Sequence, residues 1–188
     1  MGRPENYLKY HDSYENEFSE SWLNKLSMFF LIEKQVSGIH LTGKKMRIDA
    51  IITPKDKSDW KNKDIAFGIE FKSPTKLDRL HSQTNFMRQC VDYSYTDFKN
   101  FGYIPILSCP RFDLDKTYSD NKSLTAFRHF LNSFQVGELD YTYRGLSIIF
   151  AEHHFIWEDG IVNEGKHWSL KKNFGSKKYR ICPSLIVD

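Results

Sequence analysis

The sequence has few of the features that mark secreted or membrane proteins. It contains only three cysteines, Cys90, Cys109 and Cys182, without CxxC spacing. This count argues against a disulfide framework or a zinc cluster and favours reduced thiols. The longest apolar run covers about five residues, 28–32, whereas a membrane-spanning helix needs roughly 20. The N-terminus also lacks the apolar segment of a signal peptide. We therefore expect a cytoplasmic protein without a membrane partner.

A strong charge of either sign is also lacking. The 27 Lys and Arg residues and 24 Asp and Glu residues leave a net charge of +3. That balance permits nucleic-acid binding without requiring it. Aromatic residues make up 15% of the chain, too many for a disordered protein. The length of 188 residues suits a single domain, 1–188.

The spacing of apolar residues predicts a mixed α/β (α+β) domain with a central mixed sheet flanked by helices. Residues 1–13 are expected to be a loose lead-in. Helices are predicted over 14–34, with Ser13 as N-cap, and over 80–98 and 123–134. Strands are predicted over 39–41, 45–52, 65–72, 103–108, 146–151, 154–157 and 161–162, with Asp159-Gly160 as a hairpin turn.

The most informative segment is the strand that contains Glu70 and Lys72. Side chains alternate along a strand, so Glu70 and Lys72 share one face, and Phe67, Ile69 and Phe71 share the other, apolar face. Charged groups beside a buried sheet cost desolvation free energy. A metal ion with a phosphate is the usual compensating partner for such a set.

Asp49 lies in the preceding predicted strand and can join this pair. If strands 45–52 and 65–72 form a hairpin, Asp49 lies on the side of Glu70 and Lys72, while Ile48, Ala50 and Ile52 share the core side. Two carboxylates bind Mg²⁺ readily, because a hard cation prefers oxygen ligands.

These residue types are suited to phosphodiester hydrolysis. We expect Asp49 and Glu70 to hold Mg²⁺, with the backbone carbonyl of Phe71 as a further ligand and Mn²⁺ as a substitute ion. The metal would polarise the phosphate and lower the pKa of a bound water. Lys72 would orient or deprotonate that water, or neutralise charge in the transition state.

The order Asp49, then Glu70-Phe71-Lys72, resembles the PD-(D/E)xK nuclease superfamily. Upstream, Glu15-x-x-Phe18-x-x-x-Trp22 resembles the first-helix glutamate of that family, although Glu17 and Glu20 compete with Glu15 for this role. Downstream, Gln89-x-x-x-Tyr93 resembles its glutamine–tyrosine pattern on the following helix. The proline of the family motif is absent, since Ile48 precedes Asp49.

The resemblance implies a restriction-endonuclease-like αβββαβ core over about 14–108, with a C-terminal elaboration over 109–188. It implies a metal-dependent nuclease that hydrolyses phosphodiester bonds, with DNA favoured over RNA as the partner and a homodimer left open. The implied catalytic residues are Asp49, Glu70, Lys72, Gln89 and Glu15.

Basic and aromatic residues supply candidates for nucleic-acid contacts. Arg47, Lys76, Arg88 and Tyr93 lie near the predicted site in sequence. A denser basic segment near the C-terminus contains Lys171, Lys172, Lys177 and Lys178. Such residues bind phosphate backbones, although charged segments are often only solvated.

Three alternatives remain open on the sequence alone. Asp49 and Lys72 could form an ordinary cross-strand ion pair, with Glu70 solvated. The chain could be a catalytically inactive nuclease-like module that binds nucleic acid or a protein partner, because a fold does not fix a function. A different acid-cluster enzyme could use Asp113, Asp115 and Asp120, in a polar loop without a rigid scaffold.

Overall fold

A computed structural model of the chain describes residues 5–57, 63–77, 80–112, 121–142, 145–150, 153–158 and 161–163. The helices are α1 (Glu5–Leu26), α2 (Leu80–Ser94) and α3 (Asn121–Ser133), with a short 3₁₀ helix, η1 (Pro74–Lys76). The strands are β1 (Phe30–His40), β2 (Lys45–Pro54), β3 (Phe67–Phe71), β4 (Thr96–Phe98), β5 (Ile106–Cys109), β6 (Val136–Thr142), β7 (Gly145–Phe150), β8 (His153–Glu158) and β9 (Ile161–Asn163).

The strands form one mixed sheet of nine strands in the order β4-β1-β2-β3-β5-β6-β7-β8-β9. Strands β1, β2 and β3 are antiparallel, β3, β5 and β6 are parallel, and β6 to β9 are antiparallel again. The predicted fold class is therefore confirmed, and the αβββαβ element order holds with the short edge strand β4 inserted after α2. Among the described helices, none is long and apolar enough to cross a membrane.

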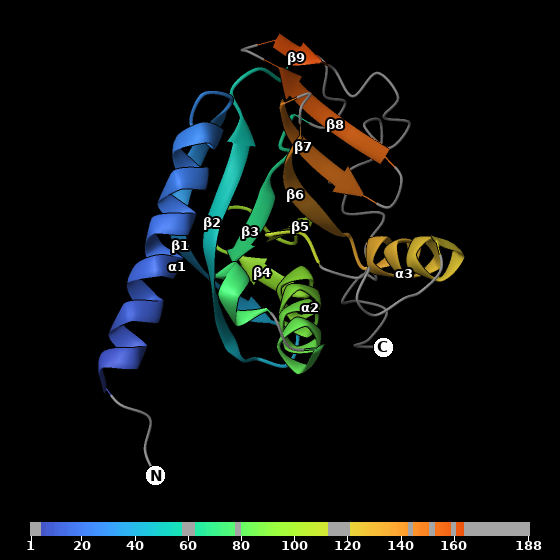
Figure 1. Cartoon of the computed structure of the whole chain (residues 1–188). Coiled ribbons are helices and arrows are strands. Elements are labelled where there is room, and N and C mark those ends of the chain that lie inside the picture. Colours follow the sequence, from blue (N-terminus) through green and yellow to red (C-terminus); the bar gives the residue numbers. More distant parts are fainter. Residues whose placement is uncertain are drawn as a thin grey trace.

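The helices lie on opposite faces of the sheet (Figure 1). On one face, Leu23 and Leu26 of α1 pack against Phe67, Ile69 and Phe71 of β3. The other face is covered by the apolar side chains of α2 and α3. The predicted apolar face of β3 is thus confirmed as the α1 face, and its even-numbered residues point towards α2.

The first predicted helix is wrong at both ends. Helix α1 begins at Glu5, so Ser13 lies inside the helix and is not its N-cap, and the helix ends at Leu26 instead of continuing to Lys34. Residues from Phe30 onwards form β1, where Phe30 faces Pro54 and Ile32 faces Ile52. Apolar residues four positions apart fit either a helix or a strand. Pairing with β2 shows that these residues form a strand.

Two further differences concern short or polar strands. The predicted helix 80–98 ends at Ser94, because residues 96–98 pair with β1 as strand β4. Strand β6 was not predicted at all, since Glu138 and Asp140 interrupt its apolar pattern. The predicted Asp159-Gly160 turn lies outside the described residues, but the strands on either side of it do pair antiparallel.

The side-chain alternation of β2 breaks at Asp49. Ala50 and Ile52 pack on the α1 face as predicted, but the prediction is wrong for Ile48, which packs on the α2 face. A Cβ atom added to Gly68 would lie 2.6 Å from Cδ1 of Ile48, so this side chain covers Gly68 directly. Because Gly68 has no side chain, Ile48 has room on the α2 face, although ideal alternation would place Ile48 on the α1 face.

The break in β2 has a counterpart in β1. The register pairs Lys34 with Ala50 and Val36 with Ile48, but it skips Gln35 and Asp49 between them. Gln35 has φ +54°, in the left-handed region that side chains other than glycine rarely adopt. The hairpin is therefore kinked at the position of the predicted metal ligand, and the kink brings the Gln35 side chain to Asp49.

Candidate active site

Asp49 lies where β2 separates from β3. The last paired residues are Ala50 and Ile69, and the next residues along the two strands are Asp49 and Glu70. In place of a backbone rung, the Asp49 carboxylate accepts the Phe71 N–H at 2.9 Å through Oδ2. The Gln35 amide donates to Oδ1 at 3.3 Å. Asp49 thus occupies the notch between two strands and is held from both sides.

Glu70 is the buried acid of the site, with only 3% of its surface exposed. The Gln89 amide of α2 donates a hydrogen bond to Oε1 at 2.5 Å, while Oε2 is buried and accepts no hydrogen bond within the described part of the chain. Burial, and after it the negative charge of Asp49, raise the pKa of the Glu70 carboxyl to about 8 against the lowering effect of Lys72. The site favours a proton, or another cation, at this carboxylate.

Lys72 supplies the only positive charge recorded in direct contact with Glu70 in the described structure. Its Nζ lies 3.6 Å from Oε1 of Glu70 and 3.8 Å from Oε1 of Glu15, and its side chain is 29% exposed. Its backbone N–H donates to the Cys109 carbonyl at 2.8 Å, which fixes the end of β3 against β5. The alternative of a solvated Glu70 beside an Asp49–Lys72 pair is therefore wrong.

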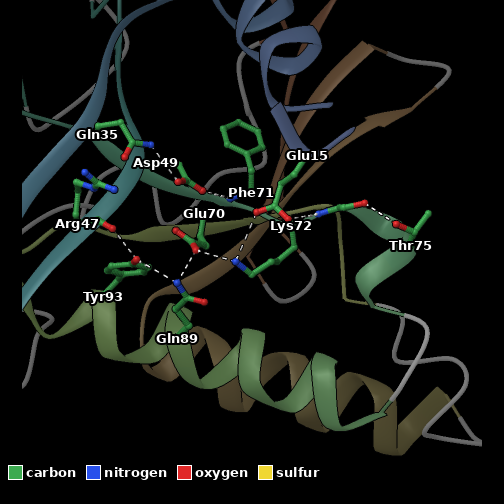
Figure 2. A network of polar contacts seen from close by, with 11 residues as sticks. Glu15, Gln35, Arg47, Asp49, Glu70, Phe71, Lys72, Thr75, Gln89 and Tyr93 are labelled. Carbon is green, nitrogen blue, oxygen red and sulfur yellow. Dashed lines mark hydrogen bonds and ion pairs between the residues drawn. The ribbon is translucent and has the colours of Figure 1, made fainter. Parts of the chain in front are cut away.

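Glu15 is the acid of α1 that reaches this group (Figure 2). Its Oε2 accepts the backbone N–H of Ser73 at 3.4 Å, and its Oε1 faces Lys72. Of its two competitors, Glu17 is exposed, and Glu20 pairs with Lys34 at 2.7 Å. The structure thus selects Glu15 among the three glutamates that the sequence left open.

Gln89 belongs to a hydrogen-bonded chain that ties α2 to β2 (Figure 2). Its amide also donates to the Tyr93 hydroxyl at 3.1 Å, and that hydroxyl donates to the Arg47 carbonyl at 2.7 Å. Tyr93 is only 4% exposed. Its expected role as a nucleic-acid contact is therefore corrected: Tyr93 holds Gln89 from the interior.

The donor set of this site suits a hard cation. No three His, Cys, Asp or Glu side chains converge in a metal-binding arrangement within the described ranges. The site still contains two carboxylates, those of Asp49 and Glu70. Oε2 of Glu70 accepts no hydrogen bond within the described residues and can accept a cation. The Phe71 N–H points to Asp49, and the carbonyl of an extended residue faces the same neighbouring strand as its N–H. Two carboxylates and a carbonyl match Mg²⁺, which keeps several waters.

Some of the remaining candidate residues lie near the site, and others lie outside the described residues. Arg47 and Arg88 are exposed beside the site, on β2 and α2. Lys76 lies in η1, directly after β3. The tail residues Lys171, Lys172, Lys177 and Lys178, and the alternative acids Asp113, Asp115 and Asp120, lie outside the described residues.

Gln35 is the site residue that sequence reasoning missed. It lies in an exposed segment of β1, where a glutamine carries no signal of function. Its contact with Asp49 depends on a positive φ and on a skipped rung, and neither has a marker in the sequence.

No protein-family model, curated protein or solved structure matches this chain.

Proposed function

We propose that this protein is a metal-dependent nuclease of the PD-(D/E)xK type, which hydrolyses phosphodiester bonds, with DNA favoured over RNA. One observation carries the proposal. Asp49 and Glu70 lie side by side at the point where two strands separate, with Lys72 beside the buried acid and an unpartnered oxygen on Glu70. An acid pair with one buried member, Glu70, is unfavourable without a cation.

Asp49 and Glu70 would hold Mg²⁺, with the Phe71 carbonyl as a third oxygen. When bound, the ion would supply Lewis-acid polarisation of the phosphate and a water of lowered pKa. The cation would also offset the repulsion that contributes to the raised pKa of Glu70.

The other residues have separable roles in this proposal. The Lys72 ammonium is positioned to orient a water or to stabilise negative charge that develops on the phosphate. Gln89 fixes the orientation of Glu70 through its amide. Glu15 holds Lys72 in place and fixes the backbone after β3 through Ser73.

The chain topology gives independent support. The elements from α1 to β5 follow the αβββαβ order that the family resemblance implies, with β4 as an edge addition. The motif residues come from α1, β2, the end of β3 and α2, as that resemblance requires. Four motif positions from separate elements that meet in one site are a stronger argument than the E-x-K pattern alone.

A cleavage assay tests the proposal. Labelled single-stranded DNA, duplex DNA, branched DNA and RNA would be incubated with Mg²⁺, Mn²⁺ or EDTA, and wild type compared with Lys72→Ala. We expect metal-dependent cutting of DNA that is lost in the variant. Binding without cutting under every metal would overturn the nuclease assignment in favour of the inactive binding module.

A further inference from the structure

The buried polar residues of the site continue across the sheet. Glu70 of β3 pairs with Ser108 of β5, and Ser108 pairs with Glu138 of β6. All three are buried, with 3%, 0% and 4% of their surfaces exposed. Paired residues of parallel strands point to the same face, so this row lies beneath the α2 and α3 side of the sheet.

Two arginines meet at the far end of this row. Arg111 follows β5, and Arg128 lies on α3. Their Nε atoms each lie 3.5 Å from Oε2 of Glu138. Oε1 of the same carboxylate accepts the Phe112 N–H at 3.1 Å. Glu138 therefore orients two guanidinium groups from different elements around one point.

The terminal nitrogens of these guanidinium groups are the donors that a further ligand can reach. Both Nε atoms are buried beside Glu138 and donate no hydrogen bond within the described structure. Nη1 of Arg111 donates to Asp140 at 3.0 Å. The side chains of Arg111 and Arg128 remain 33% and 24% exposed. Each guanidinium has five donors in a rigid fork that matches phosphate oxygens. Asp140 engages one terminal nitrogen of Arg111, whereas Arg128 is recorded only against Glu138 within the described residues.

The distance between the arginine pair and the acid pair is comparable to the spacing of phosphates along a nucleic-acid strand. Neighbouring strands are about 4.8 Å apart, so Glu138 lies roughly 10 Å from Glu70 along the row. One strand of a duplex places a phosphate every ~3.4 Å along the helix axis. Successive phosphates also advance around the helix, so they lie farther apart than this rise. The arginines can thus face a phosphate about one or two nucleotides away from one at the acid pair.

We propose that Arg111 and Arg128 form a second phosphate site, which binds the backbone of the same nucleic acid a few nucleotides from the scissile bond. The inference rests on the proposed nuclease function and extends it. Glu138 positions the two arginines, and this site sets how the strand runs across the α2 and α3 side of the sheet.

The first test measures the salt dependence of binding. Ca²⁺ replaces Mg²⁺ to disfavour cutting, and fluorescent forms of the single-stranded, duplex and branched DNA and of the RNA used in the cleavage assay report the Kd across a range of salt. Removing one phosphate contact lowers the slope of log K against log salt by about 1. We expect this for Arg128→Gln. The matched control is Lys34→Gln, which removes an exposed cation paired with Glu20 on α1 and should leave the slope unchanged.

Two further variants separate phosphate binding from a purely structural ion pair. Arg128→Lys keeps the charge and should restore most of the slope but not the full affinity, because a lysine lacks the fork. Glu138→Gln retains an oxygen for the Phe112 N–H but removes the charge that competes for the arginines. We expect it to bind the oligonucleotide more tightly than wild type, whereas a structural pair alone predicts no gain. Thermal melting confirms that each variant folds.

The outcomes distinguish this inference from the proposed function. If wild type cuts and every variant keeps the same slope and affinity, the second phosphate site is wrong and the nuclease stands. If the slope falls as expected but no metal supports cutting, the phosphate site stands and the nuclease is wrong. If wild type neither binds nor cuts any nucleic acid, both are wrong.

Discussion

Asp49 and Glu70 are the first residues of β2 and β3 beyond the last paired rung, Ala50–Ile69. The two acids therefore face each other at the position where the hairpin opens, and the Asp49 carboxylate takes the Phe71 N–H there. Because Glu70 is buried and Asp49 is charged, the pKa of Glu70 rises to about 8. This arrangement makes the pair sensitive to protons and to cations.

The variant Asp49→Asn should lose thermal stabilisation by Mg²⁺. A ligand that binds only the folded state at 100 times its Kd stabilises it by ~2.7 kcal/mol, and the amide removes one charged ligand. Differential scanning fluorimetry with and without Mg²⁺ measures the shift in Tm. Asp97→Asn, at the exposed middle residue of β4, is the control and should keep the wild-type response. An unchanged Mg²⁺ shift in Asp49→Asn would contradict the metal site.

Replacing Lys72 with alanine should reduce the cleavage rate by on the order of 10²-fold or more, as expected for a group that stabilises transition-state charge. Because the Lys72 side chain is 29% exposed, the fold should survive. Single-turnover rates at saturating Mg²⁺ provide the measurement, and Lys99→Ala, in an exposed turn, provides the control. A folded Lys72→Ala protein that cuts at the native rate would exclude the assigned role.

Without metal, the protein should become less stable as pH rises from about 4.5 to about 8. The pKa of Glu70 is raised from 4.5 to about 8 by folding, so the folded state holds a proton that the unfolded state has lost in this range. The stabilisation is complete below pH 4.5 and is lost as pH rises through 8. Urea unfolding in EDTA at several pH values measures it for wild type and Glu70→Gln. A difference between the two proteins that does not vary with pH would contradict a buried protonated Glu70.

Replacing Gln35 with glycine should separate its backbone from its side chain. Glycine adopts positive φ without steric penalty, so the variant should fold at least as stably as wild type, with a gain of up to about 1 kcal/mol. It should nevertheless cut more slowly, because Asp49 loses the amide that orients it. Asn100→Gly is the matched control: Asn100 is exposed and has φ +70°. Equal cleavage rates in all three proteins would show that Gln35 has no part in the site.

The local strand pattern is what made the centre of this site predictable. Period-two spacing in β3 correctly separated Glu70 and Lys72 from Phe67, Ile69 and Phe71. The side-chain alternation depends on neighbours within a few residues, which a sequence displays directly. Glu15 and Gln89 were expected beside these residues only because their motifs resemble those of the PD-(D/E)xK superfamily, and the choice among Glu15, Glu17 and Glu20 required the structure.

The features that sequence reasoning missed depend on contacts distant in the chain. Strand β6 contains Glu138, whose burial is possible because Arg111 and Arg128 face it. The false helical extension after Leu26 fits helical spacing until β2 pairs with residues from Phe30 onwards. The kink at Gln35 reverses the expected face of Ile48, and no residue type marks it.

The pairing of β3 with β5 also determines the order in which the chain can assemble the site. Asp49 and Glu70 meet in a hairpin of neighbouring strands, whereas Gln89 arrives with the longer crossover that parallel strands need. Closing a longer segment costs more entropy, so local pairs form first. We expect a nascent chain to carry both acids in water before the covering elements arrive. The buried environment that favours a cation at Glu70 would then form only with the last contacts of folding.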